Sequence, residues 1–75
     1  MNEIHAIDTL EEYLEHRRDL RGCVIQGLDL GQVRTKWREA RIEGAIFLGC
    51  TFPDEVLELE LIRRGAVLFL SLIHI

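Results

Sequence analysis

Large apolar residues recur at five-residue intervals in two separate blocks of this chain. They are Leu20, Ile25 and Leu30 in the first block and Ile42, Phe47 and Phe52 in the second. Small residues stand two positions before several of them, namely Cys23, Ala40, Ala45 and Cys50. This spacing resembles that of pentapeptide repeats, whose large and small residues point into a square β-coil. Stacked-repeat folds need several units to enclose a core, so the pattern predicts a coil of one or two turns, or else two short strands joined by turns.

A helical spacing of apolar residues precedes the first block. The stripe consists of Ile7, Leu10, Tyr13 and Leu14. It predicts a helix from Leu10 to about Arg18. Thr9 and Glu12 have the spacing of a capping box, in which each side chain binds a free backbone N–H at the helix start. We therefore expect Thr9 to be the N-cap.

A second helix is predicted after the second block, between Pro53 and Arg64. Pro53 suits the first helical turn, where its missing N–H removes no hydrogen bond. Glu60 and Arg64 are four positions apart and predict an ion pair on the helix surface. Gly65 predicts the C-terminal cap. A broad apolar face is expected from Val56, Leu57, Leu61 and Ile62, and a buried strand from Ala66 to Phe69.

The polar segment from Gly31 to Glu39 separates the two blocks. Val33 and Trp37 are four positions apart, which predicts a short helix with one apolar edge. We interpret Trp37 as a core or interface residue rather than a cofactor platform, because a large indole contributes most when it is buried.

Taken together, these elements predict an α/β (or α+β) fragment: a helix, short strands with the five-residue spacing, a second helix and a C-terminal strand. We expect residues 1–69 to form one small N-terminal region of a larger protein. A chain of 75 residues buries only about 60% of its unfolded surface, so this region is expected to be marginally stable alone.

Charge and composition limit the partners and the location. The formal net charge is −4, and the cluster of Arg17, Arg18 and Arg21 is interleaved with acidic residues. Nucleic acids and anionic membranes require a basic surface, so neither is expected as a partner. The chain opens with no signal-peptide pattern, and its two cysteines form no disulfide framework, so we expect a cytoplasmic protein with buried, reduced thiols.

Residues 70–75 read Leu-Ser-Leu-Ile-His-Ile, which matches a reading frame of a transposon-end sequencing adapter. We therefore interpret them as an artefactual tail and expect the natural sequence to be visible only to Phe69. The run Val67–Ile73 is uncharged and β-prone, which predicts aggregation or a homo-oligomer formed through the edge of that strand.

No set of residues in this sequence predicts a catalytic, cofactor-binding or metal site. The Gly-x-Gly-x-x-Gly and phosphate-loop patterns are absent, and the only serine, Ser71, lies in the tail. His5 and His16 have no third ligand at metal spacing and are expected to be solvated. Asp29, between two leucines, is expected to stabilise a turn with its own carboxylate.

Three stretches nevertheless resemble a known family. They are Val-Ile-Gln-Gly-Leu-Asp-Leu at 24–30, Gly-Ala-Ile-Phe-Leu-Gly-Cys at 44–50 and Arg-Gly-Ala-Val-Leu-Phe at 64–69. Over about Leu20 to Phe69 the chain is similar to the N-terminal region of larger bacterial proteins of the LOG (lonely guy) type, also called lysine-decarboxylase-like or Rossmann-fold nucleotide-binding proteins. The resemblance implies a downstream Rossmann-like domain that binds a nucleotide such as AMP and hydrolyses the N-glycosidic bond of a nucleoside monophosphate.

The family's signature, Pro-Gly-Gly-x-Gly-Thr followed by a glutamate, is absent from these residues. No functional residue is therefore carried over, and the resemblance implies a segment without cofactor or activity of its own. Two alternatives stay open: a small pentapeptide-repeat-like module that binds a protein partner, and a small standalone regulatory protein.

Overall fold

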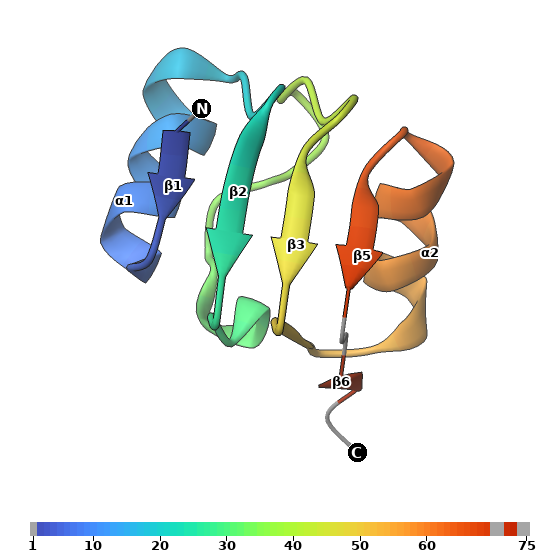
Figure 1. Cartoon of the computed structure of the whole chain (residues 1–75). Helices are drawn as coiled ribbons and strands as arrows, with labels where there is room; N and C mark the ends of the chain where they lie inside the picture. The colour runs from blue at the N-terminus through green and yellow to red at the C-terminus, as the bar shows by residue number, and fades with distance from the viewer. Residues whose placement is uncertain (1, 70–71, 74–75) are drawn as a thin grey trace.

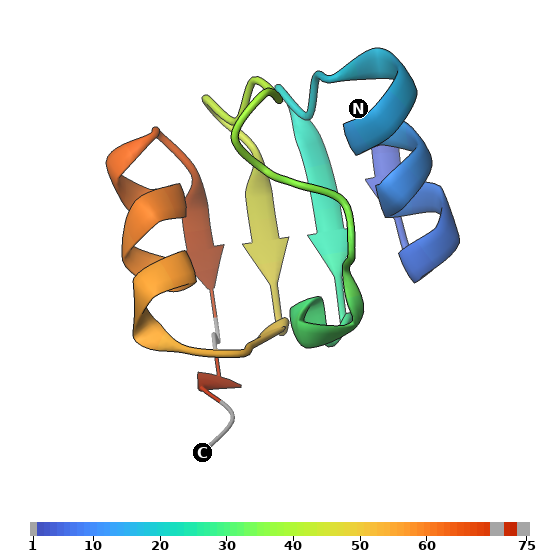
Figure 2. The same ribbon diagram turned by 180° about the vertical axis from the view of Figure 1, so that it is seen from behind.

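The computed structural model, which describes residues 2–69 and 72–73, has two α-helices on one face of a small parallel sheet. The four strands of this sheet are, in order, β1 (Asn2–Ile4), β2 (Cys23–Gln26), β3 (Ile46–Leu48) and β5 (Val67–Phe69) (Figure 1). Helices α1 (Ile7–Glu12) and α2 (Glu55–Arg63) and the segment between β2 and β3 cover the same face (Figure 2). The predicted α/β class is confirmed.

Neighbouring strands of the sheet are also consecutive along the chain. Val24 pairs with Ile46 and Ile46 pairs with Val67, so partners are about 21–22 residues apart. A second pair of short strands, β4 (Thr51–Phe52) and β6 (Leu72–Ile73), is also parallel and repeats this offset. The chain therefore winds as a coil. Each turn of the coil contains one or two short strands, and a helix or loop forms the rest of the turn. The predicted square β-coil, which needs a strand on each of its four sides, is therefore not formed.

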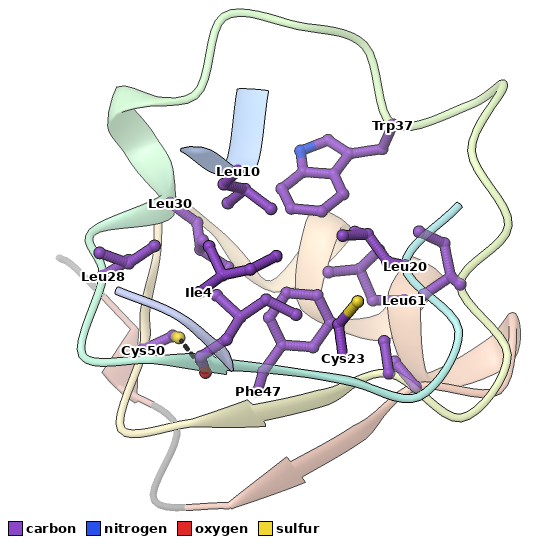
Figure 3. Close-up of a cluster of buried hydrophobic side chains, with 14 of the residues drawn as sticks. Ile4, Leu10, Leu20, Cys23, Leu28, Leu30, Trp37, Phe47, Cys50 and Leu61 are labelled. Carbon is purple, nitrogen blue, oxygen red and sulfur yellow. Dashed lines mark hydrogen bonds between the residues drawn. The ribbon is translucent and has the colours of Figure 1, made fainter. Parts of the chain in front are cut away.

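The core contains every residue of the five-residue series. All six of the large residues are buried, and so are the four small ones that precede them. Phe47 lies at the centre, with its ring centroid 5.9 Å from that of Trp37 and 6.1 Å from that of Phe52 (Figure 3). Cys50 joins two turns of the coil, because its Sγ donates a hydrogen bond to the carbonyl of Ile25 over 3.3 Å (Figure 3).

Two buried segments of the coil follow one spacing. Their buried positions are Leu20, Cys23, Ile25, Leu28 and Leu30, and then Ile42, Ala45, Phe47, Cys50 and Phe52. Leucine-rich repeats have this spacing, L-x-x-L-x-L-x-x-N/C-x-L, and a repeat length in the same range. The five-residue periodicity is thus part of a longer pattern that repeats once per turn.

The first helix starts earlier than the sequence predicts. Helix α1 begins at Ile7 with Ala6 as its N-cap, and no side chain caps it. Thr9 therefore lies inside the helix, and the predicted capping box is wrong. The reason is β1, which the sequence pattern did not predict: the chain leaves that strand at Ile4 and turns at once into the helix. The helix continues as a π-helical turn, η1 (Tyr13–Arg17).

The apolar stripe of the first helix packs as predicted. Leu10 and Leu14 are buried, and Ile7 and Tyr13 are half-buried against the core. The guanidinium of Arg17 lies 4.7 Å from the centre of the Tyr13 ring, which covers the outer side of that ring.

Helix α2 begins at Glu55, two residues later than predicted. Asp54 is the N-cap, and its carboxylate accepts a hydrogen bond from the N–H of Leu57 over 2.9 Å. Pro53 therefore lies before the helix and not in its first turn. Gly65 follows the C-cap residue with φ of +99°, which confirms its predicted role because few other residues adopt that conformation.

The segment between the two blocks forms no helix beyond the short 3-10 turn η2 (Leu30–Gln32). The helix predicted from Val33 and Trp37 is wrong, although Trp37 is buried in the core as expected. Two spaced apolar residues can both reach the core from an irregular segment, which here includes a turn in which the N–H of Ala40 donates to the carbonyl of Trp37 over 3.1 Å. Here tertiary contacts, and not helical periodicity, determine their positions.

Arg64 holds this irregular segment in place. Its guanidinium donates hydrogen bonds to the carbonyls of Trp37 over 3.0 Å, of Arg38 over 3.5 Å and of Ala40. The predicted ion pair with Glu60 is absent from the described residues, because the Arg64 side chain turns toward these carbonyls instead. The C-terminal end of α2 thus anchors the connection between β2 and β3.

Candidate interaction surface

One face of the four-stranded sheet carries apolar side chains that no described helix or loop covers. Strand residues alternate between the two faces, so the neighbours of the inward-facing Ile25, Phe47 and Leu68 point outward. Val67 and Phe69 are 42% and 51% exposed. We call the outward apolar residues the open-face cluster: Val24, Ile46, Leu48, Val67 and Phe69.

The strand register aligns the cluster in two rows. Val24, Ile46 and Val67 form one row, and Leu48 and Phe69 belong to the next. Adjacent strands in a sheet lie about 4.8 Å apart, so the side chains within a row are in reach of one another. The cluster is therefore one continuous apolar strip across β2, β3 and β5.

Polar residues border the strip on the side of β1. Glu3 pairs with Val24 across the sheet, and its carboxylate lies 3.1 Å from the Nε2 atom of His5. In the second row, the position on β2 that pairs with Leu48 is occupied by the polar residue Gln26. The apolar character thus increases from β1 toward β5.

Strand β5 forms the edge of the sheet, and within residues 2–69 and 72–73 its only strand neighbour is β3. An edge strand presents backbone N–H and C=O groups that can pair with a further strand. The association predicted through Val67–Ile73 lies partly at residues 70–71, outside the described residues, as do residues 74–75 of the predicted tail.

Among residues 2–69 and 72–73, no set of side chains suited to catalysis lies together. His5 and His16 are exposed, as expected, and Asp29 accepts a hydrogen bond from the N–H of Gly31 over 3.0 Å, which confirms its turn-stabilising role. In the described part of the chain, no group of three metal-binding side chains lies together, and no helix is long and apolar enough to cross a membrane.

Both cysteines are buried free thiols, as the sequence predicts. Burial raises the pKa of the Cys23 thiol and of the Cys50 thiol, so both stay protonated and unreactive at neutral pH. Asp19 accepts hydrogen bonds from the Arg21 side chain over 2.9 and 3.0 Å, and these lower the pKa of its carboxyl to about 2. Neither arrangement provides a nucleophile or a general base.

Comparison with known proteins adds no relative: no protein-family model matches the chain, and no curated protein or solved structure was found to be similar to it.

Sequence reasoning missed the open-face cluster, although a signal for it exists. The strands Ile-Phe-Leu at 46–48 and Val-Leu-Phe at 67–69 are apolar at every position. Uninterrupted apolar strands are typical of parallel sheets that are covered on both faces. Within the described residues only one face of these strands is covered, and the other face leaves Val67 and Phe69 exposed.

Proposed function

We propose that this chain is the N-terminal segment of a LOG-like nucleotide-binding protein, that it has no activity of its own, and that its open-face cluster packs against the downstream Rossmann-like domain of the parent protein. The observation that carries this proposal is the pair of strands β3 and β5, which are apolar on both faces but covered on one. A second layer on the open face would complete the sandwich of layers typical of α/β proteins.

The positions of the resembling stretches support this role. Residues 24–30 include β2, residues 44–50 include β3, and residues 64–69 include β5. Every residue of the open-face cluster belongs to one of these stretches. The part of the chain that resembles the family is therefore the part that forms the uncovered apolar face.

The gain from covering this face is moderate. Complete burial of a Val or Phe side chain contributes about 1.5–3 kcal/mol, and Val67 and Phe69 are each about half exposed. Covering these two residues alone therefore contributes about 1.5–3 kcal/mol before the entropic cost of docking. This magnitude suits an intramolecular contact between two parts of one chain.

The genomic locus beyond the codon for Phe69 provides the first test. A reading frame that continues into Pro-Gly-Gly-x-Gly-Thr supports the proposal. A stop codon directly after the residues 70–75 contradicts it. In that case the alternative, a small module that binds a protein partner, explains the stacked turns of the coil and the uncovered face better.

A binding experiment tests the docking itself. The chain is titrated calorimetrically with the separately produced downstream domain, and Phe69→Ser is expected to lower the binding affinity. Leu59→Ser, on the exposed face of α2, is the matched control and should leave the binding affinity unchanged. The isolated chain should release no adenine from AMP; release would show that it carries an activity that this proposal denies.

A further inference from the structure

Helix α2 carries a second uncovered apolar surface, on the side of the molecule away from the open-face cluster (Figure 2). Val56, Leu59 and Ile62 are 76%, 56% and 48% exposed, although the sequence predicts a packed face that includes Val56 and Ile62. Val56 and Leu59 line a shallow depression together with Glu60 and Arg63. Leu61, in contrast, is fully buried against the core.

Two opposite charges on this outward face, Glu55 and Arg63, are placed symmetrically about Leu59. Leu59 is the middle residue of α2, with Glu55 four positions before it and Arg63 four positions after it. A helix turns by about 100° per residue, so Glu55 and Arg63 each point within about 40° of the direction of Leu59. They lie about 6 Å from it along the helix axis, in opposite directions.

We propose that α2 is a self-association surface, on which a second copy of this chain packs its own α2 antiparallel about a two-fold axis at Leu59. In that arrangement Glu55 of each copy lies at the same level as Arg63 of the second copy, so two ion pairs flank the apolar contact. A parallel arrangement would place Glu55 against Glu55 and Arg63 against Arg63. Charge complementarity between Glu55 and Arg63 therefore favours the antiparallel orientation of the second copy.

The predicted association is weak. A helix of nine residues is about 14 Å long, and its contact area is well below the about 1,200 Å² at which stable interfaces begin. The exposed ion pairs are screened by salt, so the association should weaken as ionic strength rises. Since α2 and the open-face cluster lie on opposite sides of the sheet, this contact does not depend on the proposed docking.

Sedimentation velocity at concentrations up to about 1 mM, where interfaces of this size become populated, tests the proposal. The wild-type chain is expected to dimerise in this range. Glu55→Arg and Arg63→Glu each convert the two attractive pairs into repulsive ones and should weaken the dimer about tenfold. An equimolar mixture of the two variants should associate again, because the first offers only positive and the second only negative charges at these positions.

Glu12→Arg is the matched control, because it changes the net charge as Glu55→Arg does but lies on α1, and it should leave the dimer unchanged. Leu59→Ser replaces an exposed residue, preserves the fold and should abolish association. A monomeric wild type at about 1 mM, or a mixture of the charge variants that fails to associate, overturns the proposal. So does dimerisation that Phe69→Ser abolishes and Leu59→Ser does not, since it would assign the contact to the strand edge.

Discussion

Replacing Arg64 by methionine should destabilise the chain because it releases the segment that joins β2 and β3. The guanidinium of Arg64 donates to carbonyls of Trp37, Arg38 and Ala40, which have no regular secondary structure to fix them. Methionine retains the aliphatic stem and most of the volume but has no donor. The change therefore isolates the hydrogen bonds from the packing.

The expected loss follows from the number and the setting of these bonds. A hydrogen bond that involves a charged group contributes about 1.5–3 kcal/mol when well formed. The bond to the Trp37 carbonyl has an ordinary length of 3.0 Å, and the Arg64 side chain is half-buried, so water replaces part of what is lost. We expect the free energy of unfolding to fall by about 2 kcal/mol, a large part of the total for a chain of this size.

Urea unfolding followed by tryptophan fluorescence measures this loss directly, because Trp37 is the only tryptophan and lies in the anchored segment. Glu60→Gln is the control. It would weaken an ion pair between Glu60 and Arg64, but the structure assigns Arg64 to the carbonyls, so the control should change the free energy of unfolding by less than about 0.5 kcal/mol. Equal effects of the two variants would refute the anchoring role of Arg64.

Three further results are expected. Phe47→Ala should lower the free energy of unfolding by about 3–5 kcal/mol in the same urea experiment, because Phe47 is fully buried between two aromatic rings, whereas Phe69→Ala on the open face should cost less than about 1 kcal/mol. The Asp19 carboxyl should titrate near pH 2 by NMR, and Arg21→Gln should return the pKa of that carboxyl toward 3.8. Because the pKa of Asp19 is lower in the folded chain, the contribution of this carboxyl to stability is complete above about pH 4 and is lost as the pH falls toward 2. Cys50 should react with a thiol reagent at neutral pH only as fast as the chain unfolds, and rapid labelling of the native chain would contradict its burial.

Local signals in the sequence predicted the elements that local chemistry determines. Gly65 ends α2 because its positive φ suits glycine, and Asp29 binds its own turn through a contact two residues away. Both interactions involve neighbouring residues, so their physics is contained in a short stretch of sequence.

The failures share one cause, which is competition from contacts that are distant in sequence. Strand β1 has only one apolar residue in the core, Ile4, and forms because it pairs with β2 about 21 positions away. Its presence moves the start of α1 away from Thr9. Similarly, the segment around Trp37 is irregular and not helical, and Arg64 binds the Trp37 carbonyl from 27 positions away.

The sequence alone determined the inward positions of the coil, the two helices, and the lack of any motif for catalysis or for binding nucleotides or metals. It did so because apolar spacing reports on burial directly, and because Gly65 marks the end of α2. Only the tertiary structure decided which side of β5 and of α2 faces the core. Strand β5 is apolar on both faces, and α2 carries apolar residues around most of its circumference. Which face of each element turns toward the core depends on parallel strand pairing at long range. That choice exposes the open-face cluster and, on α2, the residues Val56, Leu59 and Ile62. These are the two surfaces that we propose to contact other parts of the parent protein or a second copy.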